Sequence, residues 1–134
     1  SKEYEDEASE DLVFKKRFLH YIKFKGLDYD QKNLVEYNSP YANKQDGSIE
    51  FNLTDFEDYL EEKRIKMKRV DLVLNVQKIL KAKKIKGKVN MGTKEEKDYK
   101  SCVSWRIKDF TLDNKDIIIE GVVEELPKGI TDGS

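Results

Sequence analysis

Apolar residues in this chain occur in short runs that charged residues interrupt. The longest runs contain three residues, at 12–14, 72–74 and 117–119. A membrane-spanning helix needs about twenty mostly apolar residues, so we expect none here. Short apolar runs between charges are typical of amphipathic elements that bury one side. Because 37% of the 134 residues are hydrophobic, although 40% are charged, we expect one folded domain with a single core.

The two ends of the chain are polar and differ from its centre. We expect an acidic N-terminal arm at 1–11, a single α+β domain at 12–126 and a polar tail at 127–134. The chain starts at a serine and shows no signal peptide, so it is interpreted as a domain of a longer polypeptide. Its single cysteine, Cys102, excludes an internal disulfide and a zinc site built on cysteine pairs. An intracellular location, cytoplasmic or nuclear, is expected.

The first half of the domain predicts one helix and a hairpin. Phe14, Phe18 and Ile22 recur every four residues, which indicates a helix over 12–25 that ends at Gly26. Two short strands are expected at 34–37 and 48–53, joined by the turn-rich residues 40–47.

A second helix is indicated by a capping signal. Thr54 is followed three residues later by Glu57, the spacing of a capping box, so the helix is expected to start at Asp55. This helix is expected to bury three residues: Phe56, Tyr59 and Leu60.

The segment 65–84 has two interpretations. Its apolar residues recur at helical spacing, which favours a helix at 70–84, but alternating Val70, Leu72, Leu74 and Val76 are also typical of a strand. With a helix, the next elements are a short strand at 85–89, a charged tip at 90–100 and a strand at 101–107. That order resembles the later part of a winged-helix domain, whose second helix can enter a DNA major groove.

With a strand, the chain would form an OB-like, partly open barrel. Such a barrel binds single strands by base stacking in a basic groove. Its strands would be 65–80, 85–90, 99–107 and 117–125, with a short helix near 108–112. Under either interpretation, 117–123 is the strongest β-branched run, with Gly121 marking a bulge or a close approach of another segment.

Positive charge is concentrated in the segment 63–88. Eleven Lys or Arg residues stand there against Asp71 alone, a net charge of +10, which leaves −11 for the remainder of the chain. Nine of the eleven are lysines, which favours phosphate contacts over base reading by arginine. The predicted nucleic-acid-binding residues are Lys66, Lys68, Arg69, Lys78, Lys81, Lys83, Lys84, Lys86, Lys88, Lys94, Lys97 and Lys100. Lys78, Lys81 and Lys84 are expected on one side of the 70–84 helix, and the candidate stacking residues are Tyr99, Trp105 and Phe110.

No catalytic apparatus is apparent. His20 is the single histidine, the seven glycines form no phosphate-binding loop, and Cys102 lies in a predicted strand. A metal-dependent nuclease is the enzymatic alternative, built on 61–63 or 95–97, where two glutamates precede a lysine. We expect that the domain is not an enzyme. We also expect it to bind no cofactor, metal, membrane or small-molecule substrate.

Two functions are therefore predicted. The first is a non-catalytic module that contacts the phosphate backbone of nucleic acid through 63–88, as part of a larger protein. The alternative is a protein–protein docking domain within a multi-subunit assembly.

Overall fold

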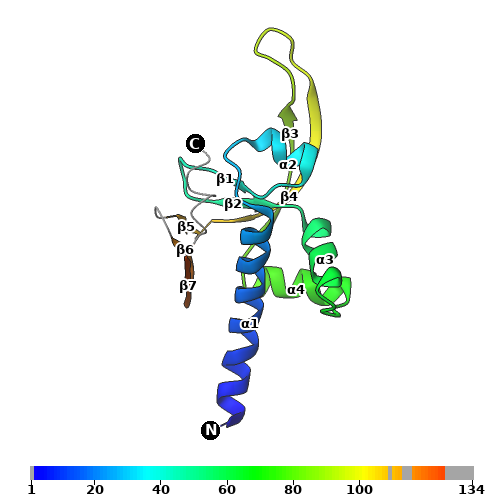
Figure 1. The fold of residues 1–134 in the computed structure, drawn as a ribbon. Helices are drawn as coiled ribbons and strands as arrows, with labels where there is room; N and C mark the ends of the chain where they lie inside the picture. The colour runs from blue at the N-terminus through cyan, green and yellow to red at the C-terminus, as the bar shows by residue number, and fades with distance from the viewer. Residues whose placement is uncertain (1, 109, 113–115, 126–134) are drawn as a thin grey trace.

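A computed structural model describes residues 2–108, 110–112 and 116–125. They form four helices and seven strands (Figure 1). In chain order these are α1 (Lys2–Lys25), α2 (Gln31–Tyr37), β1 (Tyr41–Ala42), β2 (Ile49–Phe51), α3 (Leu53–Glu62), α4 (Arg69–Lys78), β3 (Lys83–Asn90), β4 (Tyr99–Ile107), β5 (Thr111–Leu112), β6 (Asp116–Ile119) and β7 (Val122–Glu125).

The strands form two separate antiparallel sheets. The larger has the order β1-β2-β4-β3, and the smaller has the order β5-β6-β7. The α+β class is thereby confirmed. Neither sheet closes into a barrel and residues 69–78 are helical, so the OB-like alternative is wrong.

Helices α1, α3 and α4 lie at one end of the larger sheet, whereas α2 lies beside the β3–β4 hairpin (Figure 1). Figure 1 shows α1 descending from the sheet, with α3 and α4 beside it and the small sheet on its other side. The β3–β4 hairpin extends away from this helical end, so much of its length lies beyond the core. No helix in the described residues is long and apolar enough to cross a bilayer.

An aromatic cluster forms the centre of the core. Phe56 of α3 lies between α1 and β2, with its ring 5.4 Å from that of Phe18, 4.9 Å from Tyr21 and 6.1 Å from Phe51. Edge-on and tilted ring pairs at these distances are favourable beyond the area they bury. The predicted helix over 12–25 and the burial of Phe56, Tyr59 and Leu60 are confirmed.

The predicted capping box of α3 is wrong. Asn52 is the N-cap residue, and its side-chain oxygen accepts from the backbone N–H of Asp55 at 3.0 Å. Thr54 and Glu57 instead accept hydrogen bonds from Arg69, at 3.3 and 3.0 Å. The two residues that suggested a cap therefore tie α3 to the start of α4.

The predicted strand at 34–37 is also wrong, because these residues belong to α2. Asp30 caps this helix by accepting from the N–H of Lys32 at 3.0 Å, and Asn38 ends it in the left-handed conformation. The hairpin partner of β2 is instead β1, through the pairs Tyr41 with Glu50 and Ala42 with Ile49. Short polar side chains favour such helix ends, so Asp30 and Asn38 were the signals that outweighed β propensity.

Residues 70–84 do not form one helix. The helix is confirmed over Arg69–Lys78, where Leu72 and Val76 are buried on one side. Lys81 then takes a positive φ of 56°, and Lys83 and Lys84 belong to β3. Lys78, Lys81 and Lys84 consequently do not share one side of a helix, because the chain changes direction after α4.

The C-terminal β-branched run is a hairpin and not one strand with a bulge. Gly121 has a φ of 84° and lies in the turn between β6 and β7, a conformation that glycine adopts without strain. The expected short helix near 108–112 is wrong where the structure describes it, since Thr111–Leu112 is β5.

Ion pairs join the small sheet to α1. Lys23 Nζ lies 2.7 Å from Glu124 Oε2, and Lys15 Nζ donates to the backbone oxygen of Glu120 at 2.6 Å. The hydrogen bond from Lys23 lowers the pKa of Glu124, and the charges of Lys23, His20 and Lys16 lower it further. The helix that carries these lysines is continuous with residues 2–11, the predicted acidic arm.

Replacing Glu124 by glutamine is expected to lower the free energy of unfolding by about 1 kcal/mol at neutral pH. Because the pKa of Glu124 is lower when folded than when unfolded, this stability is present above the ordinary carboxyl pKa. It is lost as the pH falls through the lowered value. Urea unfolding from about pH 7 to about pH 2 should show the wild type converging on E124Q. A difference that stays constant over this range would contradict the assignment.

Candidate nucleic-acid interface

One face of the β3–β4 hairpin carries a row of lysines. In the observed register Lys84 lies opposite Trp105, Lys86 opposite Val103, and Lys88 opposite Ser101. Directly opposed residues project from the same side of a sheet, and alternate residues do likewise. We call this side the lysine face. Its residues are Lys84, Lys86, Lys88, Asn90, Tyr99, Ser101, Val103 and Trp105, and none is acidic.

The lysine face meets α4 in a groove of about 470 Å³. Arg69, Val73 and Gln77 of α4 line one wall, four residues apart and hence on one side of the helix. The rest of the lining comes from the hairpin and the start of α3: Lys84, Val103, Trp105, Asn52, Leu53 and Thr54. The groove makes the hairpin and α4 one continuous surface.

The outer side of α4 carries two exposed apolar residues. Val70 is 62% exposed and Leu74 is 43% exposed, and Gln77 follows on the same side. The helix contains one arginine, Arg69, whose guanidinium contacts Glu57 and Thr54 of α3. Thus α4 presents methyl groups and an amide to solvent together with the charged Asp71 and Lys78, while most of the cations lie on the neighbouring hairpin.

The loop at the end of the hairpin is held by its own hydrogen bonds. Asn90 Oδ1 accepts from the backbone N–H groups of Gly92 and Asp98, at 3.0 and 2.9 Å. A Cβ at Gly92 would overlap the backbone oxygen of Glu96, so this position requires glycine. Lys32 of α2 also donates to the Gly92 oxygen, at 3.1 Å. The end of the hairpin is therefore anchored to α2.

Several predicted lysines do not belong to the lysine face. Lys83 and Lys100 project from the opposite side of the hairpin, because Lys83 pairs with Arg106 and Lys100 with Val89. Lys81 Nζ lies 3.0 Å from Glu120 Oε2, and their hydrogen bond lowers the pKa of Glu120. Lys78 is exposed in the last turn of α4.

The remaining predicted cations have acidic neighbours. Lys94 and Lys97 are exposed in the end loop, where Glu95, Glu96 and Asp98 accompany them. Lys66 and Lys68 lie in the α3–α4 connection and line a groove of about 1070 Å³, together with Glu57, Glu61 and Asp71. Both groups therefore offer less net positive charge than the lysine face.

The structure separates the three predicted stacking residues. Trp105 is 6% exposed and packs in the core, and Phe110 is buried there as well. Neither side chain can therefore stack on a base. Tyr99 is 55% exposed at the outer end of the lysine face. Of these three, Tyr99 is the one placed to contact a ligand.

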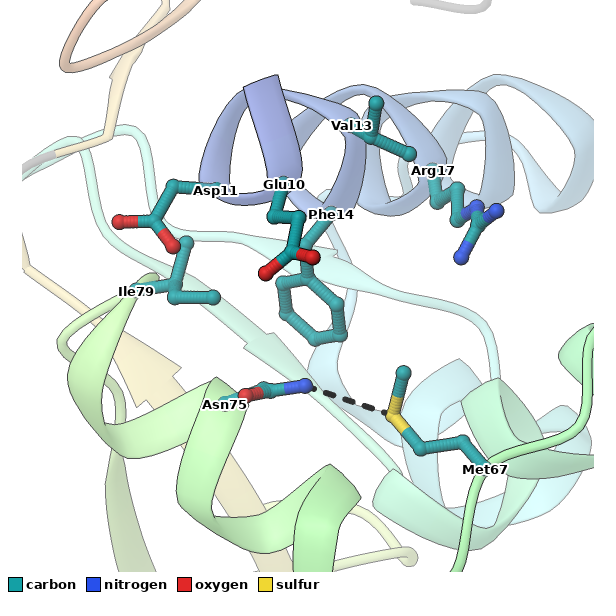
Figure 2. Close-up of a pocket in the computed structure, with 8 residues that line it drawn as sticks. All are labelled: Glu10, Asp11, Val13, Phe14, Arg17, Met67, Asn75 and Ile79. Carbon is teal, nitrogen blue, oxygen red and sulfur yellow. Dashed lines mark hydrogen bonds between the residues drawn. The ribbon is translucent and has the colours of Figure 1, made fainter. Parts of the chain in front are cut away.

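A separate pocket of about 610 Å³ lies between α1 and α4 (Figure 2). Figure 2 shows Phe14 of α1 facing Asn75 of α4, whose amide donates to the sulfur of Met67 at 3.5 Å. The other lining residues are Glu10, Asp11, Val13, Arg17 and Ile79. Carboxylates at this pocket would repel phosphate, so it is not part of the interface.

The groups considered for catalysis are dispersed. His20 is exposed, with Nε2 3.9 Å from Glu124, and the pKa of the Cys102 thiol is raised by burial and by the charge of Glu50. The triplet 61–63 spans the end of α3, and 95–97 lies in the hairpin loop. Among the described side chains, no three of His, Cys, Asp or Glu are grouped as metal ligands.

No family model, curated protein or solved structure matches this chain. Counting charge along the sequence identified Lys84, Lys86 and Lys88 but missed the four uncharged residues that complete the surface: Thr54, Val70, Leu74 and Gln77. The spacing of the last three, which is helical, was the signal available for them.

Proposed function

We propose that this domain binds nucleic acid, mainly through contacts between the lysine face and backbone phosphates. The observation that carries the proposal is the row Lys84, Lys86 and Lys88, on a hairpin face that holds no carboxylate. Alternate residues of a strand lie about 7 Å apart, so the row spans about 13 Å. Successive phosphates advance about 3.4 Å along the axis of one strand, so the row covers about four of them.

The order of the elements supports a winged-helix domain as the fold. Helices α3 and α4 are consecutive, the β3–β4 hairpin follows, and β4 pairs with both β2 and β3. In this arrangement α4 would be the helix directed to a duplex, and the hairpin would be the wing beside it. The groove that joins α4 to the lysine face favours duplex DNA as the ligand, because both elements border one surface.

The test compares two double variants on opposite faces of the same hairpin. Binding of a labelled duplex of about 20 base pairs is followed by fluorescence anisotropy between about 50 and 200 mM salt. K86Q/K88Q should bind about tenfold more weakly, with a salt slope reduced by about 2. The matched control K83Q/K100Q removes the same charge from the other face and should retain most of the affinity.

Equal losses of affinity in the two double variants would contradict the proposal. Binding would then depend on the total charge of the hairpin and not on the face that carries it. The alternative function is docking to a protein subunit. It predicts a partner that remains bound in high salt and that binds K86Q/K88Q as well as the wild type.

A further inference from the structure

The exposed side of α4 combines two apolar residues with a glutamine, and the charged Asp71 and Lys78 flank them. Val70, Leu74 and Gln77 follow one another at spacings of four and three residues, which places them on one side of the helix. Gln77 also lines the groove beside Lys84 and Val103, so this side continues directly into the lysine face. A ligand that contacted both this side and the lysine face would carry apolar groups between its charges.

We infer that α4 enters the major groove of duplex DNA and recognises A·T pairs. Val70 and Leu74 would contact the C5 methyl groups of thymine, and the amide of Gln77 would pair with N6 and N7 of adenine. In the major groove, thymine offers the methyl, while glutamine is the side chain that pairs bidentately with adenine. This inference rests on the proposed function and adds to it the class of sequence that is bound.

The arginine of α4, the residue type that most often reads guanine, is not free to do so. Guanine is read most often by arginine, through two hydrogen bonds to O6 and N7. Arg69 is the arginine of α4, and its Nη1 lies 3.0 Å from Glu57 and 3.3 Å from Thr54. Its guanidinium is therefore engaged within the protein. The lysine face supplies the complementary charge for phosphates on either side of the groove.

The experiment changes the methyl groups of the duplex without changing its charge. Affinities are measured for two duplexes of one A·T-rich sequence, one with thymine and one with deoxyuridine. Two G·C-rich duplexes, with cytosine or with 5-methylcytosine, form the second pair. The thymine duplex should bind about fourfold more tightly for each methyl buried, and 5-methylcytosine should improve binding in the same direction.

Variants of α4 test whether this helix causes the preference for methylated duplexes. V70A/L74A should lose the preference for thymine over deoxyuridine, while a control, V123A, changes an exposed valine on β7 and should keep it. Q77A should become insensitive to replacement of adenine by 7-deaza-adenine, which lacks N7. Circular dichroism checks that the folds agree.

The possible failures can be told apart. Equal affinity of the wild type for the thymine and deoxyuridine duplexes, with the lysine dependence retained, overturns the inference and leaves the proposed function standing. A methyl preference that persists in V70A/L74A also overturns it, since another element would then be the reader. Salt-dependent binding to RNA alone overturns the inference but not the binding of nucleic acid. Absence of salt-dependent binding to DNA and RNA, or a stable complex with protein alone, overturns both proposals.

Discussion

Replacing Phe56 by alanine is expected to lower the free energy of unfolding by about 3–5 kcal/mol. Phe56 is fully buried, and its ring contacts those of Phe14, Phe18, Tyr21 and Phe51. These rings come from α1, β2 and α3, so the cavity would open where the helices meet the sheet. Partial collapse of neighbouring side chains recovers little, because three separate elements define the space.

Urea unfolding followed by the fluorescence of Trp105, the one tryptophan of the chain, measures this loss. The matched control is F24A, because Phe24 is exposed and lies on the same helix as Phe14, Phe18 and Tyr21. F24A should cost less than about 1 kcal/mol. Where F56A proves unfolded in water, Phe56→Leu provides a smaller, measurable loss. Equal effects of F56A and F24A would show that the aromatic cluster is not the centre of the core.

Trp105→Ala is expected to destabilise the domain by about 3–5 kcal/mol as well, whereas Trp105→Phe should preserve the fold. Trp105 lies on β4 with Phe51 opposite on one side and Lys84 opposite on the other, where the hairpin leaves the core. Its ring also lines the groove against α4. Loss of the ring would free the base of the hairpin from the helices and so displace the lysine face.

This pair of variants also decides between packing and base stacking at position 105. Thermal unfolding by circular dichroism measures stability, and anisotropy with duplex and single-stranded oligonucleotides measures binding. Because Trp105 is 6% exposed, W105F should bind both ligands as the wild type does. Binding that weakens several-fold in W105F, with an unchanged fold, would show that the indole contacts a base.

The helices of this domain could be predicted where burial follows a regular spacing. Phe14, Phe18 and Ile22 are four residues apart and all are buried, as are Phe56 and Leu60 in α3. The prediction failed where short polar side chains set the boundaries. Asp30 and Asn38 made 34–37 part of a helix, and Asn52 displaced Thr54 as the cap of α3. Caps depend on one or two hydrogen bonds, so a neighbouring residue with similar chemistry can replace the expected one.

The sequence located the segment that carries the candidate site, but it could not show which lysines share one face. The net charge of +10 over 63–88 already identified the segment, because the count needs no geometry. It could not separate Lys84, Lys86 and Lys88 from Lys83 and Lys81. Lys83 differs from Lys84 by one position in a strand, and Lys81 meets Glu120, a residue 39 positions away.

By itself, the sequence determined that the chain has amphipathic elements around one core and a lysine-rich central segment, because both properties depend on residue type and local spacing. The tertiary structure decided which lysines share one face. Strand register sends alternate side chains to opposite faces, so one residue of shift would exchange the lysine face for its opposite. The packing of α4 beside the hairpin then placed Gln77 in one groove with Lys84, and Val70 and Leu74 lie on the same side of the helix as Gln77. Such a neighbourhood exists only once distant segments meet.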